Sequence, residues 1–285
     1  MRSNHLIEFR NQLAELNNCF SHYIFVWEQF YIDNDKIIKS DSDKFTTAIY
    51  PTNPNSRQFN VQLQHLDNSH HETYNFILKS LFLLTYSQFE VYMRTFYEFA
   101  RKADNSLPNL TVKERVPDDI FVHLSLDIAK LFDQKEVWTF DYLRLRRNRI
   151  THSGGQSKGD LADLIRQRGN AIQTFWTTKL TNGLFGINFQ SHDTDNFSKE
   201  EVFDLINIWR ALTDKIDEIV CNKIGIESII LNLLNEFETI NKSKIKMWGN
   251  DRSKNKFETY CKINFDISLS TDELKNVIFK NGVVA

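Results

Sequence analysis

The spacing of apolar residues near the N-terminus predicts one long amphipathic helix. Apolar side chains recur every three or four residues, which is the period that places them on one face of a helix; they are Leu6, Phe9, Leu13, Leu16, Phe20, Tyr23, Trp27 and Phe30. The pattern predicts a helix over residues 4–33 that ends near Asp33. Residues 40–70 lose this period and carry Pro51 and Pro54, so we expect a loop or small hairpin there.

The middle of the chain predicts further helices. Over residues 72–101 the apolar face is so wide that we expect other elements to cover this helix on more than one side. Pro117 and the two aspartates after it favour the first turn of a helix that reaches about residue 132. Another helix is expected over residues 135–151, where Gly154 and Gly155 follow as a C-terminal cap.

The segment after that helix predicts a mixture of helix and strand. Residues 159–171 have a helical pattern. Two β-prone stretches, 174–180 and 184–190, flank Thr181-Asn182-Gly183, so we expect a β-hairpin insertion over residues 172–191. Ser198 and Glu201 form a capping box that opens a last body helix, with Trp209 on its apolar face.

The last sixty residues change character and predict a small α+β element over residues 226–285. A helix near residues 227–238 precedes a basic, polar loop over residues 242–256. Cys261, Ile263, Phe265 and Ile267 then alternate with polar residues, which favours a strand, and Ser270 caps a short terminal helix. We therefore expect a helical body over residues 1–225 and this separate tail.

Composition narrows the functional class. The chain has 35 basic and 37 acidic residues, so overall charge does not indicate a polyanion partner. Three cysteines with long spacings favour a reducing compartment, and no apolar run is long enough to cross a membrane. We expect a cytoplasmic protein that binds no membrane and no metal, since no pair of ligands has metal-site spacing. The sequence also lacks nucleotide-binding glycine loops and a serine-hydrolase elbow, and no cofactor is expected.

The local charge, unlike the nearly balanced overall charge, is strongly positive in the helix of residues 135–151, which holds the densest basic cluster. Arg144, Arg146, Arg147 and Arg149 fall within six residues, and between Asp141 and Arg168 there are seven basic against three acidic residues. Such a cluster attracts phosphates. A solvated helix face would carry the same charges, so the cluster alone does not decide between the two.

Arg147-Asn148-Arg149-Ile150-Thr151-His152 matches the R-N-x-x-x-H motif, and here the chain resembles the HEPN superfamily. The motif ends a helix that two helices precede and a closing helix follows, an order that resembles the HEPN arrangement over about residues 70–223. The resemblance implies a mainly α, HEPN-like helical bundle, here with the hairpin insertion and the α+β tail. It also implies a metal-independent endoribonuclease that acts as a homodimer with a composite site, in the manner of bacterial toxins or anti-phage defence effectors.

The chemistry of the motif residues fits RNA cleavage. His152 is suited to act as general acid and base at the 2′-hydroxyl, and Arg147 to stabilise the charge that grows on the phosphate. Asn148 and His152 are four residues apart and share a helix face, whereas Arg147 lies 140° away, on the inward stripe. Asn148 is expected to hold the phosphate or orient the histidine. The other three arginines are expected to steer RNA: Arg144, Arg146 and Arg149.

Three alternatives stay open. Glu90 is a candidate partner of Arg147, but it is also spaced to form an ordinary surface pair with Arg94. The motif could belong to a non-catalytic HEPN-type module that binds RNA, a nucleotide or a protein. The chain could also be one subunit of a larger defence complex, or the partner of an antitoxin.

Overall fold

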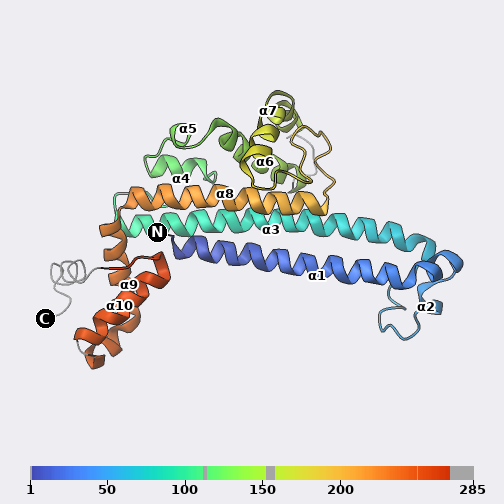
Figure 1. Ribbon diagram of the computed structural model, residues 1–285, viewed down its shortest axis with the longest axis horizontal. Coiled ribbons are helices and arrows are strands. Elements are labelled where there is room, and N and C mark those ends of the chain that lie inside the picture. The colour runs from blue at the N-terminus through green and yellow to red at the C-terminus, as the bar shows by residue number, and fades with distance from the viewer. Residues whose placement is uncertain (1, 112–113, 152–157, 249, 270–285) are drawn as a thin grey trace.

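The computed structural model shows an elongated, mainly helical molecule and describes residues 2–111, 114–151, 158–248 and 250–269. Three long helices lie side by side and form its axis: α1 (Asn4–Ser40), α3 (Leu66–Ala103) and α8 (Lys199–Ile224) (Figure 1). A pair of helices crosses one side of this bundle, α6 (Gln134–Thr151) and α7 (Lys158–Lys179), next to the short α4 (Asp118–His123) and α5 (Ile128–Leu131). At one end lie α9 (Ile226–Trp248) and α10 (Asn250–Phe265).

The core is built from aromatic residues that α3, α6 and α8 bring together. Phe89 of α3 lies 4.3 Å from Trp209 of α8 between ring centroids and 6.1 Å from Phe140 of α6. Phe89 and Trp209 are fully buried. Buried aromatic residues of this size contribute much of the hydrophobic stabilisation of a domain, so these contacts fix the position of α6 on the bundle.

The predicted N-terminal helix is confirmed, but it runs seven residues further than expected. Ser3 caps α1 by accepting a hydrogen bond from the Leu6 amide, and the helix continues past Asp33 to Ser40. Within the extension, the Asn34 side chain donates to the Phe30 carbonyl, and Asp35 pairs with Lys39. Asp35 and Lys39 face solvent, and the half-buried Asn34 also accepts a hydrogen bond from the Tyr50 hydroxyl at 3.0 Å, so these polar residues do not end the helix.

The tip of the molecule connects α1 to α3. Between them lie the four-residue helix α2 (Thr46–Ile49) and the 3₁₀ turn η1 (Leu63–His65), with one isolated antiparallel bridge between Phe45 and Gln62. The expectation of an appended loop is therefore confirmed, although a full hairpin does not form. The tip extends beyond the N-terminal end of α8, so only α1 and α3 run there (Figure 1).

The expected β-hairpin at residues 172–191 is wrong. Residues up to Lys179 continue α7, and residues 180–198 are irregular. Ile172 and Trp176 are both fully buried, one helical turn apart, and the Trp176 indole donates to the Thr139 hydroxyl of α6 at 2.8 Å. Packing against α6 thus overrides the local β preference of the threonines. A glycine turn does form at Gly183, where φ is +70°.

The α+β character expected for the tail is also wrong over the described residues. The predicted strand is the end of α10, in which Phe257, Cys261 and Phe265 recur every four residues and are buried, whereas Ile263 is 65% exposed. The predicted basic loop belongs to α9 and α10. Phe265 packs on Phe99 of α3, so the tail shares the core with the body. The expected terminal helix lies outside the described residues.

Candidate active site

Helix α6 carries the first five residues of the motif, Arg147 to Thr151, and buried polar contacts fix its position. The Glu136 carboxylate is fully buried and pairs with Lys179 of α7 and with Lys215 of α8, the latter at 2.6 Å. Burial alone would raise the pKa of Glu136, but the hydrogen bonds from the two lysines lower it below its ordinary value. Because α6, α7 and α8 each contribute one of these charged groups, the Glu136 carboxylate and its two lysines hold the three helices together.

Arg146 is a structural residue. Its side chain is 1% exposed and forms an ion pair with Glu201 at the start of α8. The guanidinium also donates to the Thr194 carbonyl at 3.0 Å, and it lies 3.9 Å from the Phe197 ring centroid. The expectation that Arg146 steers RNA is therefore wrong, because its charge is buried and fully paired.

The ion pair with Arg146 also explains why only one of the two hydrogen bonds of the expected capping box forms. Ser198 accepts a hydrogen bond from the Glu201 amide at 3.1 Å, as the sequence predicts. The Glu201 carboxylate, however, turns to Arg146 and not back to the cap residue. One residue thus joins the N-terminus of α8 to α6.

Arg144 and Arg149 are half-buried and each pairs with an aspartate. Arg144 binds Asp141 at 2.7 Å on the same helix, and Arg149 binds Asp195 at 3.0 Å in the segment before α8. The arginine side chains are 25% and 24% exposed, whereas the aspartates are 40% and 48% exposed. A pair whose carboxylate is open to solvent is weak, so both guanidinium groups can exchange the carboxylate for a phosphate.

Arg147 differs from the other three arginines. Its guanidinium donates to the Asn148 side-chain oxygen at 3.1 Å and lies 5.8 Å from the centroid of the Tyr86 ring. No carboxylate of the described residues pairs with it, although it is half-buried. A partly desolvated cation in this position favours an anionic ligand.

Tyr86 is the site residue that the sequence analysis did not single out. It is 4% exposed and lies on α3 one turn before Glu90. Burial raises the pKa of the Tyr86 hydroxyl; the nearby Glu90 raises it further, while Arg144 and Arg147 lower it. These four groups from α3 and α6 therefore share one small electrostatic environment. In the sequence, Tyr86 is one of several aromatic residues in the apolar pattern of α3. Its only distinguishing signal is that it precedes Glu90 by four residues, which is one helical turn.

Glu90 forms neither of the two expected pairs. It is half-buried beside the arginines, yet it makes no ion pair with Arg147 or Arg94. Arg94 instead donates to the backbone carbonyls of Thr111 and Glu114, at 2.9 and 3.2 Å. Glu90 thus remains a carboxylate close to the motif with no hydrogen bond to the described residues.

The acidic side of the cluster continues onto α4. Burial raises the pKa of the Asp118 carboxyl, and the nearby Asp141 raises it further, against the effects of Arg115 and Arg144.

The predicted histidine, His152, lies outside the described residues, as do the two glycines of the expected cap. Among the described residues no group of three or more histidine, cysteine or acidic side chains could hold a metal ion.

Comparison with known proteins identifies no relative: no protein-family model, no curated protein and no solved structure matches this chain. Across the described part of the chain, no helix combines the length and apolar character that crossing a membrane requires.

Proposed function

We propose that this protein is an endoribonuclease that cleaves RNA by attack of a ribose 2′-hydroxyl on the adjacent phosphate. One observation carries the proposal. In the α6 cluster of four arginines, the motif residue Arg147 is half-buried and has no carboxylate partner among the described residues, while the other three each have one. A guanidinium left without a carboxylate at a partly buried position is suited to bind a phosphate.

The chemistry needs three groups. A base takes the proton of the 2′-hydroxyl, whose oxygen attacks phosphorus, and the 5′-oxygen leaves with a proton from an acid. His152 is the proposed acid and base, and Arg147 stabilises the negative charge that grows on the phosphate oxygens. Asn148 orients the guanidinium by accepting its hydrogen bond. Histidine and arginine can do this without a metal ion, and the products are a 2′,3′-cyclic phosphate and a 5′-hydroxyl.

Steering of the RNA is assigned to Arg144 and Arg149, which flank Arg147 on α6. Both are partly exposed, and each can release its aspartate when a phosphate approaches. Glu90 is the proposed supporting residue, because it lies in the same electrostatic environment as Arg147 around Tyr86. A carboxylate near the reacting phosphate can orient a histidine or hold its proton.

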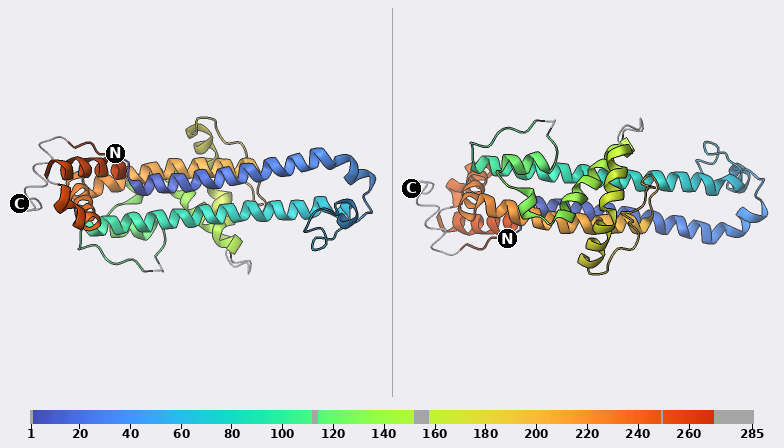
Figure 2. Two further views of the ribbon diagram at one scale, coloured as in Figure 1. Left: turned by 90° about the horizontal axis from the view of Figure 1, so that it is seen from below. Right: turned by 90° about the horizontal axis from the view of Figure 1, so that it is seen from above.

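The active form is proposed to be a homodimer that joins through the outer face of α3. This helix lies along one edge of the molecule (Figure 2). Between Thr73 and Thr95 its exposed residues carry no charge and include three apolar side chains, Phe76 at 70%, Leu84 at 43% and Val91 at 49%. The charged residues of this stretch are half-buried: Lys79, Glu90 and Arg94. Two copies of an uncharged face can meet without burying an unpaired ion.

The proposed dimer also places the two copies of the motif. Leu84 is the midpoint of this face, and Tyr86, which contacts Arg147, lies two residues further along α3 on the other side of the helix. A two-fold axis near Leu84 therefore places both copies of the motif at the same level along the dimer. By the HEPN resemblance, we further propose that the enzyme acts in the bacterial cytoplasm as a toxin or anti-phage effector, under the control of an antitoxin or of another subunit.

The proposal is tested by the ends of the RNA products. Cleavage of a labelled single-stranded RNA in EDTA should leave 2′,3′-cyclic phosphate and 5′-hydroxyl ends. A matched RNA with 2′-O-methyl riboses should stay intact, because its attacking hydroxyl is blocked. Cleavage of the methylated RNA, or products with 5′-phosphate ends, would exclude the proposed attack. Binding of RNA without cleavage would favour a non-catalytic module.

A further inference from the structure

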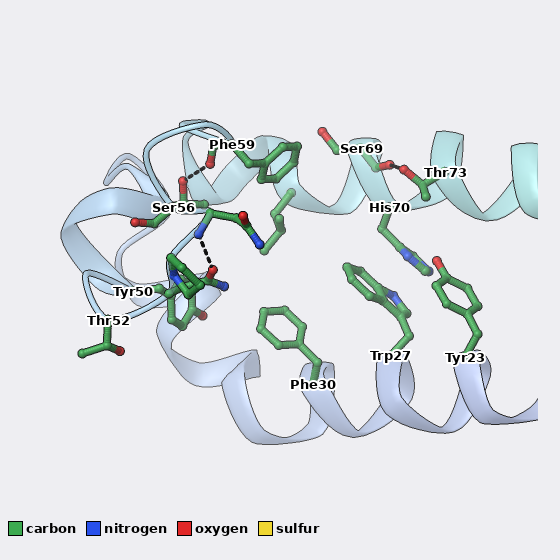
Figure 3. Close-up of a pocket in the computed structure, with 15 residues that line it drawn as sticks. Tyr23, Trp27, Phe30, Tyr50, Thr52, Ser56, Phe59, Ser69, His70 and Thr73 are labelled. Atoms are coloured by element: carbon green, nitrogen blue, oxygen red, sulfur yellow. Dashed lines mark hydrogen bonds between the residues drawn. The ribbon is translucent and has the colours of Figure 1, made fainter.

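The tip of the α1–α3 hairpin encloses a cavity of about 800 Å³ that has no part in the proposed active site. Because α8 does not reach the tip, the position that it occupies elsewhere in the bundle is empty there (Figure 1). Side chains of α1 and α3 point toward each other there and line the cavity between the two helices (Figure 3). Its volume lies within the range of protein sites that bind ligands.

Aromatic rings line the cavity on both helices and at the tip. Trp27 and Phe30 rise from α1, and His70 comes from α3 and stacks on Trp27, with ring centroids 3.9 Å apart and planes inclined by 11° (Figure 3). Tyr50 and Phe59 close the side toward the tip. No lining residue is charged. Exposed ring faces of this kind attract cations as well as other rings.

A second hollow of about 670 Å³ adjoins the first and shares the Trp27–His70 pair as a common wall. It is acidic. Three carboxylates line it, Glu28, Glu72 and Glu200, against the single ammonium group of Lys199, which pairs with Glu28 at 3.2 Å. Burial and the charges of Glu200 and Glu28 raise the pKa of the nearby Tyr74 hydroxyl to about 12, in keeping with an excess of negative charge.

We propose that the two hollows together bind an arginine-containing segment of a protein partner in extended conformation. A guanidinium would stack on the rings of the first hollow, and a neighbouring cation would meet the carboxylates of the second. This chain already uses such stacking: the guanidinium of Arg168 lies 4.6 Å from the ring centroid of Trp138. The excess of carboxylates disfavours the phosphates of a nucleic acid.

The extent of the site favours a peptide over a small metabolite. Along α3 the lining runs over ten residues, from Leu66 to Asn75, or roughly 14 Å at the rise of an α-helix. An extended peptide of about four residues spans that length. The inference is independent of the proposed ribonuclease, since none of these residues contacts the motif.

The test uses the full-length protein and a fluorescein-labelled peptide, Gly-Arg-Leu-Arg-Gly, with binding measured by fluorescence anisotropy. A second peptide has citrulline in place of both arginines, which keeps the shape and removes the charge. The protein variants are Trp27→Ala and the double variant Glu72→Gln/Glu200→Gln. Two controls lie on α1, the helix of Trp27. Phe25→Ala changes an aromatic residue outside the cavity, and Glu15→Gln changes an exposed glutamate far from it.

Binding of the arginine peptide is expected, with the citrulline peptide at least about tenfold weaker. Both site variants should weaken binding, and both controls should bind as the wild type does. Because Glu72 is exposed and Glu200 is only half-buried, their variant remains informative even if Trp27→Ala perturbs the fold. Equal binding of the two peptides, unchanged binding by the glutamate variant, or no binding of the arginine peptide would overturn the proposal. Displacement of bound peptide by free N-acetyl-arginine amide at equal concentration would also overturn it, in favour of a small-molecule site.

Discussion

The ion pair between Arg146 of α6 and Glu201 of α8 fixes the helix that carries the R-N-x-x-x-H motif to the central bundle. The pair is almost completely buried, and the Phe197 ring and the Thr194 carbonyl cover the guanidinium. The motif arginine is the next residue along the chain. The buried pair therefore determines which of two adjacent arginines is left for a ligand.

Loss of this pair should destabilise the fold. Arg146→Met leaves the Glu201 carboxylate buried without a partner, and the free energy of unfolding in urea should fall by about 3–5 kcal/mol. Arg166→Met is the control, because Arg166 forms an exposed pair with Asp163 and should change stability by no more than about 1 kcal/mol. Equal unfolding midpoints for the two variants would show that the Arg146–Glu201 pair does not hold α6.

The Glu136 junction predicts a dependence of stability on pH. Because the folded pKa of Glu136 lies below its ordinary value of 4.5, the charged carboxylate stabilises the protein above that pH. This contribution is lost as the pH falls below 4.5 through the folded pKa. Glu136→Gln should lower the melting temperature at neutral pH, and the gap to wild type should shrink in acid. A gap that stays constant across this range would contradict the assignment, with the exposed Glu15→Gln as the reference.

The proposed dimer surface predicts the effect of a single surface charge. Leu84→Arg places a cation at the centre of the uncharged face of α3, so the variant should sediment as one chain where the wild type sediments as two. Ile263→Arg is the matched control, because Ile263 is an exposed apolar residue on α10 that lies outside this face. A wild type that sediments as a single chain, or a Leu84→Arg variant that stays dimeric, would rule out this interface. Cleavage activity should fall with the dimer.

RNA binding should respond to the aspartate that pairs with Arg149. Asp195→Asn releases the guanidinium, so affinity for 2′-O-methyl RNA should rise and become more sensitive to salt. Arg149→Ala should do the reverse and reduce the slope of log affinity against log salt by about 0.7–0.9, the value for one lost phosphate contact. Asp35→Asn, which breaks a pair on α1 away from the site, should change neither quantity. Identical slopes for all variants would remove Arg149 from the RNA interface.

The sequence predicts the long helices well, because their apolar periods are long and unambiguous. Helix α6 begins at Gln134 and ends at Thr151, within one residue of the expected bounds, and Ser198 caps α8 as expected. The failures occur where two periods fit equally well. In the tail, alternate residues and every fourth residue are both apolar, and only the packing of Phe257, Cys261 and Phe265 decides for a helix.

The candidate site was predictable in its chemistry but not in its detail. The motif identifies α6 as the helix of interest. The sequence pattern places Arg147 on the inward side of this helix, whereas the structure buries Arg146 there. One position along a helix is a rotation of 100°, and the contacts that set this rotation involve Glu201, fifty-five residues away. A partner at that separation leaves no local signal in the sequence.

The proposed roles of Arg147 and His152 in RNA cleavage can be tested by incubating purified protein with total RNA in EDTA. Wild type, Arg147→Ala, His152→Ala and the control Arg166→Ala would be compared at equal concentration, with circular dichroism to verify the fold of each. The proposed mechanism predicts cleavage by wild type and by Arg166→Ala, and a loss of at least about a hundredfold in rate for the other two. Equal cleavage by Arg147→Ala, His152→Ala and wild type would contradict it.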